Sequence, residues 1–172
     1  MLENETAAIF QGQGGQHPGM GKELYDSHGE ARRVFEAASE ALDMNVATLC
    51  FTDPENRLQH AGYAQPAIVT VSIAAYRVLQ KEVGQPGHLA GHSLGEYSAA
   101  AAGEALGFPE TLKLVRERGM LMEAEAAKNP GTMVASLGVP LETMREICAK
   151  TGTDIANDNS EGQTVISGLK SR

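Results

Sequence analysis

The sequence is poor in the features that mark secreted, metal-binding or membrane-spanning chains. It has two cysteines, Cys50 and Cys148, which lie far apart and outside any Cys-x-x-Cys motif. Both are expected to be reduced, small buried hydrophobic residues. Histidine and cysteine nowhere cluster at metal-ligand spacing, so no metal site is expected. No apolar stretch approaches the roughly 18 residues of a membrane span, and the first ten residues lack the basic and apolar segments of a secretory signal. These features predict a soluble cytoplasmic protein.

Basic residues are also too few for a general nucleic-acid-binding protein. The 172-residue chain carries 14 Lys and Arg against 22 Asp and Glu, a formal net charge of −8. Contacts with a phosphate backbone need a basic face, so no nucleic-acid partner is expected. No run of five like charges marks an acidic tail. The hydrophobic content of 42% is enough for a packed core in a chain of this length.

Apolar periodicity and turn residues predict alternating strands and helices in the first 130 residues. A strand over 7–10 precedes the glycine-rich segment FQGQGGQ (10–16). A helix is predicted around 31–42, and another is predicted to begin at Gln65-Pro66, since proline suits the first helical turn. Their apolar stripes are Ala31, Val34, Phe35, Ala38 and Leu42, then Ile68, Val71, Ala75 and Leu79. A strand over 88–91, a small-residue helix over 94–103 suited to packing on a sheet, and a long helix over about 109–127 follow.

The segment Asn129-Pro130-Gly131 is a chain breaker and predicts a boundary between a large subdomain, 1–130, and a small one, 131–172. Beyond it, strands are predicted over 132–137, 154–156 and 164–167, with a helix over 141–149. This strand, helix, strand, strand order matches the first four elements of the ferredoxin-like motif, whose last helix and strand are missing. A folding unit cut in this way has unpaired strand edges, which favour pairing with another chain.

A candidate nucleophile lies in Gly91-His92-Ser93-Leu94-Gly95, between the predicted strand and the small-residue helix. A G-x-S-x-G turn of this kind forces the serine into a strained conformation at a helix N-terminus, where backbone N–H groups can stabilise an oxyanion. The alternative is a chance match, because a short pattern of common residues is weak by itself. Its placement between a strand and a helix favours the catalytic interpretation.

The wider sequence resembles malonyl-CoA:acyl carrier protein transacylases and the acyltransferase domains of polyketide and fatty-acid synthases. GHSLGEYSAA (91–100) is similar to their active-site signature, and FQGQGGQ resembles their F-P-G-Q-G-S-Q loop, with Gln11 for proline and Gly15 for serine. Further motifs follow in the family's order along the whole chain: AQPA (64–67), Arg118-Gly119, Thr132-Met133 and NDNSEGQTVISG (157–168).

The resemblance implies an α/β fold, with a parallel-sheet, hydrolase-like large subdomain and an inserted ferredoxin-like small subdomain, both incomplete in this chain. It implies malonyl transfer from coenzyme A to the phosphopantetheine thiol of acyl carrier protein through an acyl-serine at Ser93, in fatty-acid or polyketide synthesis. The expected partners are malonyl-CoA and acyl carrier protein. Coenzyme A enters as a substrate thioester, and no cofactor is expected.

The glycine-rich loop is assigned to this chemistry rather than to a dinucleotide. Gly12 and Gly14 fit the start of G-x-G-x-x-G, but His17 stands where the third glycine belongs. By resemblance, Gln13 lies beside the nucleophile and forms the oxyanion hole with the backbone N–H of Leu94. The alternative is a turn glutamine that faces water.

Arg118 gives support that does not depend on the resemblance. Its neighbours three and four residues away are all apolar, and none is acidic: Leu114, Val115, Leu121 and Met122. An arginine among apolar residues is costly unless an anion pairs with it. By resemblance, that anion is the malonyl carboxylate, held bidentately. The alternative is an arginine that extends to solvent or pairs with a distant acidic residue.

Four further residues match family positions. Met122 and Met133 are candidates for the acyl pocket, with ordinary core methionine as the alternative. Asn159 and Gln163 are candidates near the coenzyme A arm, with a structural role as the alternative.

The family's catalytic histidine, which takes the serine proton, lies beyond the V-I-x-G segment and has no match among His17, His28, His60, His88 and His92. The chain alone is therefore predicted to be inactive. It is interpreted as a fragment, as half of an enzyme completed by a C-terminal complementing chain, or as a non-catalytic remnant. Two other functions stay open: a serine acyl hydrolase, which leaves Arg118 unexplained, and a binding subunit that docks acyl carrier protein. Basic pairs for such docking are Arg32-Arg33 and Lys113 with Arg116, with solvated helix faces as the alternative.

Overall fold

The computed structural model describes residues 6–169. The chain forms two compact units, Met1–Glu123 and Ala124–Arg172, called unit 1 and unit 2 below. Their boundary falls inside α6 (Phe108–Lys128), whereas the sequence boundary at residues 130 and 131 follows the end of this helix. The assignment of the two parts to acyltransferase subdomains stays a prediction.

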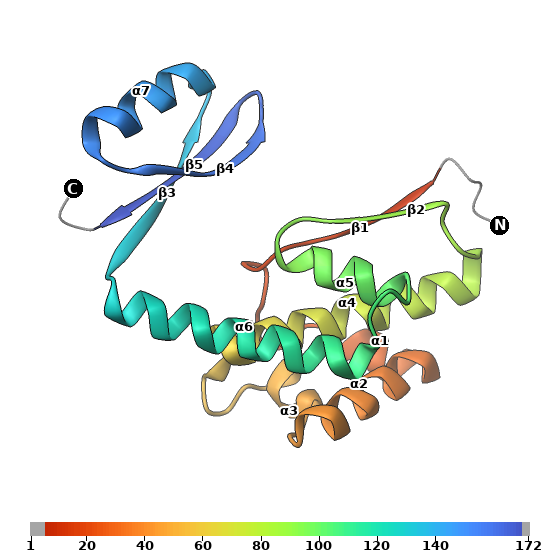
Figure 1. Cartoon of the computed structure of the whole chain (residues 1–172). Coiled ribbons are helices and arrows are strands. Elements are labelled where there is room, and N and C mark those ends of the chain that lie inside the picture. The colour runs from red at the N-terminus through yellow and green to blue at the C-terminus, as the bar shows by residue number, and fades with distance from the viewer. Residues whose placement is uncertain (1–5, 170–172) are drawn as a thin grey trace. The chain divides into compact units, whose positions relative to one another are not determined.

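Unit 1 joins a parallel pair of strands to a group of helices (Figure 1). The strands β1 (Ala7–Phe10) and β2 (His88–Gly91) pair in register from Ala7 opposite His88 to Phe10 opposite Gly91. Helix α5 (Leu94–Ala102) packs on both strands. The two predicted strands and the small-residue helix are therefore confirmed. The remaining helical elements are α1 (Lys22–Ser27), α2 (Gly29–Leu42), α3 (Val46–Phe51), the 3-10 turn Arg57–Gln59, α4 (Ala61–Val83) and the first part of α6.

Helices α4 and α5 lie on the same side of the strand pair (Figure 1). Phe10 points to this side and packs on Tyr76 of α4, with ring centroids 5.6 Å apart. Its neighbour Ile9 points to the opposite face, because side chains alternate along a strand, and it is 79% exposed. Parallel strands are normally covered on both faces, so Ile9 marks an apolar face that the described part of unit 1 does not cover.

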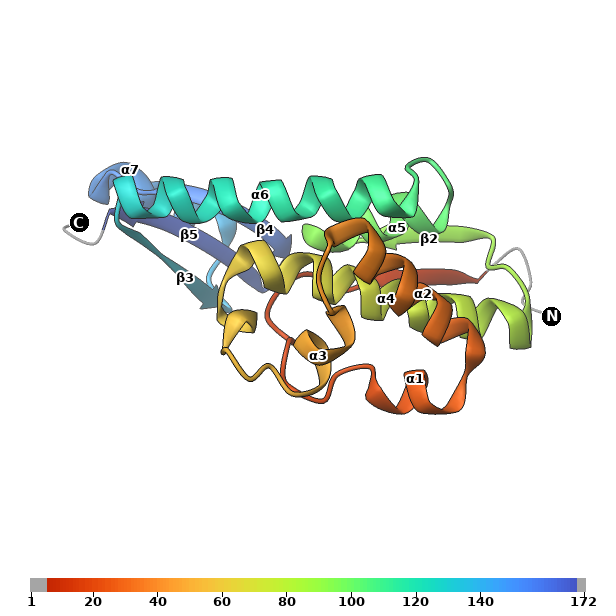
Figure 2. The ribbon, with the colours of Figure 1, turned by 90° about the horizontal axis from the view of Figure 1, so that it is seen from below.

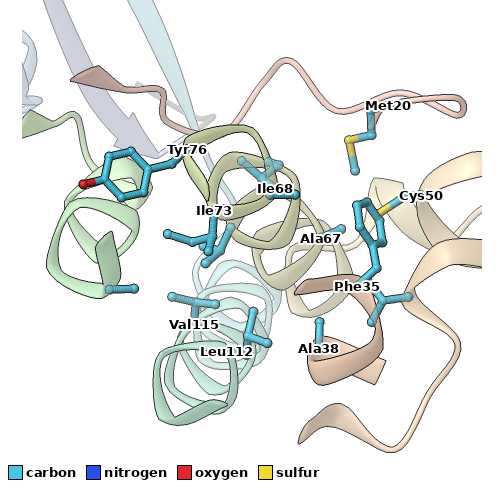
Figure 3. Packing of buried hydrophobic residues seen from close by; sticks show 14 of the residues in the cluster. Met20, Phe35, Ala38, Cys50, Ala67, Ile68, Ile73, Tyr76, Leu112 and Val115 are labelled. Atoms are coloured by element: carbon cyan, nitrogen blue, oxygen red, sulfur yellow. The ribbon is translucent and has the colours of Figure 1, made fainter. Parts of the chain in front are cut away.

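The core of unit 1 forms where α2, α4 and α6 pack together. Helices α2 and α4 lie side by side (Figure 2). Figure 3 shows Phe35 and Ala38 of α2 beside α4, and Ile73 of α4 pointing toward Leu112 and Val115 of α6. All five residues are at most 3% exposed. The predicted stripe of α2 is confirmed, with four of its members buried and Val34 packed against the same core.

Helix α4 begins four residues earlier than predicted, at Ala61 rather than Gln65. His60, with φ −97° and ψ 128°, precedes its first turn. Pro66 lies inside the helix, where it lacks the N–H that would bond to the Gly62 carbonyl. The prediction of a start at Pro66 was wrong because the turn before the proline is buried from Ala61 to Gln65 except at Tyr63. Its packing outweighs one missing hydrogen bond.

The predicted apolar stripe of α4 was wrong in part. Ile68 is buried and Val71 is half-buried, but Ala75 and Leu79 are exposed. The helix instead buries most residues on the side toward α2 and α6. Because α4 is apolar on almost every face, hydrophobic periodicity could not tell which face the rest of the chain covers.

The described part of unit 2 contains the end of α6, a three-stranded antiparallel sheet and one further helix. The elements are β3 (Gly131–Leu137), α7 (Leu141–Thr151), β4 (Asp154–Ser160) and β5 (Gln163–Leu169). The strand order is β3-β5-β4, so β5 separates the two strands joined through α7. This arrangement is a split β-α-β unit and confirms the predicted part of a ferredoxin-like motif. Strand β4 runs four residues beyond its predicted end.

Within residues 6–169, none of the helices combines the length and apolarity needed to cross a membrane. The same residues contain no group of three or more His, Cys, Asp or Glu side chains placed to hold a metal ion.

Candidate active site

Ser93 lies at the sharp turn between β2 and α5. Its backbone has φ 53° and ψ −110°, and a positive φ costs a residue with a Cβ about 1–3 kcal/mol. The turn is closed by hydrogen bonds from the Gly95 N–H to the His92 carbonyl (2.9 Å) and from the Glu96 N–H to the Ser93 carbonyl (3.1 Å). The Ser93 residue is exposed. This geometry is that of a nucleophile elbow.

Two glycines make the elbow possible through close backbone contacts. A Cβ at Gly91 would lie 2.1 Å from the carbonyl atoms of Gly95, and a Cβ at Gly95 would lie 2.1 Å from the Phe10 carbonyl oxygen. Neither backbone could yield to a side chain at such distances. The G-x-S-x-G spacing is therefore a steric requirement of this turn, where α5 starts against the end of β1.

The glycine-rich loop runs directly beside this turn. The His92 N–H donates to the Phe10 carbonyl at 3.1 Å, which extends the pairing of the two strands into the loop region. A Cβ at Gly12 would lie 3.0 Å from the His92 carbonyl oxygen. Gln13 follows Gly12 in the loop and therefore lies close to the same turn. Leu94 begins α5, and the N–H groups of a first helical turn have no partner within the helix. The loop and the helix start are thus placed to offer N–H donors near Ser93.

A chain of polar contacts joins Ser93 to Gln13 through Arg118. The Arg118 guanidinium donates from Nη1 to Gln65 Oε1 (2.8 Å) and from Nη2 to Ser93 Oγ (3.4 Å). Gln65 Nε2 in turn donates to Gln13 Oε1 at 3.3 Å. The Arg118 Cζ also lies 5.6 Å from the centre of the Tyr97 ring, a cation–π contact. Residues from the loop, α4, α5 and α6 meet at this point.

The surroundings of Arg118 differ from the predicted apolar face. Val115 is buried, but Leu114, Leu121 and Met122 are 46%, 60% and 47% exposed. The prediction failed because this face of α6 is not covered by apolar residues in unit 1. Arg118 is half-buried with a glutamine, a serine and a tyrosine around it, and the described residues give it no ion pair with a carboxylate.

Gln65 and Tyr97 belong to this group but were not predicted from the sequence. Gln65 belongs to the AQPA motif, which supported the family resemblance and a helix start but was not linked to the site. Tyr97 lies one helical turn after Ser93, on the same face of α5. Met122, which was predicted, joins the group through its sulfur, 3.4 Å from Gln65 Nε2.

The other predicted substrate-binding residues lie in unit 2. Met133 is 59% exposed on β3. Asn159 Nδ2 donates to Gln163 Oε1 at 2.9 Å, across the turn between β4 and β5. Their roles in substrate binding stay predictions.

Three histidines have polar partners away from Ser93. His17 Nδ1 is 3.0 Å from the Gly15 carbonyl, and His60 Nδ1 is 3.5 Å from a Glu123 oxygen. His28 Nδ1 is 4.0 Å from a Glu82 oxygen. All three arginines considered for carrier docking also contact their own unit, and Arg33 donates to Glu30 Oε1 at 2.9 Å. Arg32 donates to backbone carbonyls at 2.7 and 2.8 Å, and Arg116 donates to one at 3.1 Å.

Comparison with known proteins identifies the family. The family model for the acyl transferase domain matches residues 8–172, almost the entire chain. The chain belongs to the acyl transferase family. The resemblance inferred from the motifs is thereby confirmed.

Relatives of this acyl transferase chain share one name. It is 43% identical to the malonyl CoA-acyl carrier protein transacylase of Bacillus subtilis, over 96% of this chain and 43% of the relative. A Staphylococcus aureus protein of the same name is 38% identical, over 97% of this chain and 55% of the relative. The chain therefore spans about half the length of the curated relatives it matches.

Solved structures give the same result for the fold. The malonyl CoA-acyl carrier protein transacylase of Clostridium perfringens matches with a TM-score of 0.89 and 41% identity, over 95% of this chain and 53% of that one. A Xanthomonas oryzae structure matches with a TM-score of 0.91 and 39% identity, over 99% and 56%. A third structure holds a type II PKS acyl-carrier protein in complex with its malonyl-transacylase, at 34% identity and a TM-score of 0.89 over 96% and 55%. The α/β fold of this acyl transferase is confirmed.

Proposed function

We propose that this chain provides the nucleophile and the carboxylate site of a transferase that moves a malonyl group from coenzyme A to acyl carrier protein. The acyl group passes through an ester on Ser93. Malonyl-CoA and the phosphopantetheine thiol of the carrier are the two substrates, and the setting is cytoplasmic. The names of the relatives and the carrier complex of a related malonyl-transacylase support this choice.

One observation carries the proposal: the Arg118 guanidinium lies 3.4 Å from Ser93 Oγ and has no carboxylate partner among the described residues. A guanidinium offers five N–H donors in a planar fork that matches a carboxylate. In this structure it uses one of them on Gln65 Oε1 and one on Ser93 Oγ, which are both neutral oxygens. A malonyl group bound to Ser93 would bring its free carboxylate to this arginine, whereas an acetyl group has none to offer.

The chemistry follows from the elbow. Ser93 Oγ attacks the thioester carbonyl of malonyl-CoA, its proton passes to a base, and the carbonyl oxygen becomes an oxyanion. N–H donors of Leu94 and Gln13 stabilise this charge, and loss of one such donor typically costs on the order of a hundredfold in rate. The carbon–sulfur bond then breaks, and the thiolate of coenzyme A takes up a proton as it leaves. In the second half the carrier thiol gives up its proton, attacks the ester, and releases Ser93.

The base in this proposal is a histidine outside residues 1–172. The resemblance places it after the V-I-x-G segment, and the relatives are about twice as long as the matched region. A serine acyl hydrolase would use the same elbow, but it gives the Arg118 guanidinium beside Ser93 no task. Malonyl transfer accounts for both residues.

The test is the intact mass of the chain after incubation with malonyl-CoA. It is measured alone and with a second polypeptide that covers the part of a relative outside the match, with Ser93→Ala as the control. A malonyl adduct that needs both the second polypeptide and Ser93 supports the proposal. An adduct on the chain alone would mean that one of its own histidines serves as base. No adduct in either mixture would favour a non-catalytic binding subunit.

A further inference from the structure

Gln65 is a fully buried polar side chain at the centre of the site. It is 0% exposed, and its amide lies between Arg118 of α6 and Gln13 of the glycine-rich loop. Its oxygen accepts from Arg118 Nη1 at 2.8 Å, and its nitrogen donates to Gln13 Oε1 at 3.3 Å. Burying an amide is costly unless both ends are bonded, so these partners stabilise one placement of the side chain.

The hydrogen bonds in this group can run in only one direction, from Arg118 to Gln65 and from Gln65 to Gln13. Arginine has donors and no acceptor, so Gln65 must turn its oxygen toward Arg118. Its NH2 group then faces the loop, and Gln13 must meet it with an oxygen. Arg118 therefore dictates the orientation of the Gln65 amide, and Gln65 dictates which end of the Gln13 amide lies toward α4. The N–H groups of Gln13 are left for other partners.

The loop needs such an anchor because its own sequence gives it little rigidity. Gln13 is exposed and lies between Gly12 and Gly14, and the backbone of Gly14 has φ 130°. Glycine allows many backbone conformations. The side-chain bond to Gln65 fixes Gln13 to a helix at the position where it lies next to the Ser93 turn.

We propose that Gln65 is a positioning residue with two tasks. It holds Gln13 beside Ser93, and it holds the Arg118 guanidinium in the orientation that receives a carboxylate. This role deepens the proposed transferase function, on which it rests. Its physical core, the anchoring of Gln13 by the Gln65 amide, can be measured without any acyl transfer.

The first test uses the 172-residue chain labelled with 15N-glutamine, with side-chain amide dynamics measured by NMR. In the wild type we expect an ordered Gln13 amide. In Gln65→Met both bonds are lost at similar volume, and we expect a mobile Gln13 amide. In Gln65→Glu the carboxylate still accepts from Arg118 but can only accept from Gln13, so we expect the Gln13 amide to turn its NH2 group toward α4, with changed NH2 chemical shifts.

The matched control is Gln80→Glu, on the same helix. Gln80 also accepts a hydrogen bond from an arginine, from Arg77 Nη1 at 3.0 Å, but it lies about four turns further along α4. This variant is expected to leave the Gln13 signals unchanged. Far-UV circular dichroism shows whether each variant is folded. Should Gln13 stay as ordered in a folded Gln65→Met variant as in the wild type, or keep its wild-type NH2 chemical shifts in Gln65→Glu, the proposal is wrong.

The second test separates the two tasks of Gln65 in the chain together with its complementing polypeptide. A residue that serves only Arg118 would affect malonyl transfer alone. Because Gln65 also holds Gln13, Gln65→Met is expected to lower kcat for acetyl-CoA as well, on the order of tenfold to a hundredfold. Unchanged acetyl transfer would contradict the link to Gln13. Failure of the wild type to transfer any acyl group would count against the proposed function and leave the NMR result standing.

Discussion

The crossing of α4 and α6 makes a sharp prediction about Gly119. A Cβ at this position would lie 2.4 Å from the carbonyl carbon and oxygen of Ala61 and 2.6 Å from the nitrogen of Gly62. Ordinary contacts of a Cβ begin at 3.4 Å. All three atoms belong to the backbone, so no side chain can rotate away. Gly119→Ala would therefore force the two helices apart by about 1 Å at this point.

The expected cost follows from two opposing effects. Overpacking of this kind destabilises a protein by about 1–3 kcal/mol, and contact with rigid backbone places this site at the upper end. Alanine is a better helix former than glycine by about 1 kcal/mol. We expect Gly119→Ala to lower the free energy of unfolding by about 2 kcal/mol. The bond between Arg118, the adjacent residue, and Gln65 should lengthen in the same variant.

Urea unfolding followed by circular dichroism measures this change. The matched control is Gly29→Ala, since Gly29 also lies in a helix but has nothing within 4 Å of the added Cβ. The control should unfold at an equal or higher urea concentration than the wild type. If Gly119→Ala is as stable as Gly29→Ala, the helices do not cross as closely as described here, and the account of how Arg118 reaches Gln65 fails.

Other substitutions test single features of unit 1. Leu112→Ala removes a fully buried side chain and should lower the free energy of unfolding by about 2–5 kcal/mol in the same assay. Glu123→Ala removes the carboxylate that accepts from the Ala61 N–H at 2.6 Å, and loss of such a helix cap should cost about 1 kcal/mol. Burial raises the pKa of the Cys50 thiol from 9.0 to about 12, so in a Cys148→Ser variant a thiol reagent at neutral pH should react only after urea is added. Because an unfolded Cys50 ionises at lower pH than the folded one, its contribution to stability should decline as pH rises from about 9 to about 12. Fast labelling of the folded variant, or a Leu112→Ala or Glu123→Ala protein as stable as the wild type, would contradict the packing described.

Local features of this chain could be predicted from the sequence because they depend on neighbours along the chain. The strand over 7–10, the strand over 88–91 and the elbow at Ser93 are short segments with strong turn and glycine signals. The order of elements in unit 2 was also predicted, as strand, helix, strand, strand after the chain breaker at 129–131. Each of these depends on backbone preferences and on contacts within a few residues.

Features that depend on distant partners could not be predicted in the same way. Helix α4 is apolar on nearly every side, so its buried face depends on where α2 and α6 pack. The group around Arg118 joins residues 53 positions apart in the sequence. Gln65 was missed because its place in the AQPA motif does not show which side chains it contacts. Ile9 and Leu79 are exposed because no described residue covers them, which the apolar pattern of their own segments could not indicate.

The most direct test of the account is a competition between malonyl-CoA and acetyl-CoA for Ser93. The acyl-Ser93 peptides are quantified by mass spectrometry after the chain is combined with its complementing polypeptide. We predict that malonyl-Ser93 predominates in the wild type. In Arg118→Gln the ratio of malonyl-Ser93 to acetyl-Ser93 should fall about tenfold to a hundredfold. A hydrogen bond to a charged group contributes about 1.5–3 kcal/mol, and its loss corresponds to a change of this size. A ratio unchanged by Arg118→Gln, or acylation on a residue other than Ser93, would contradict the account.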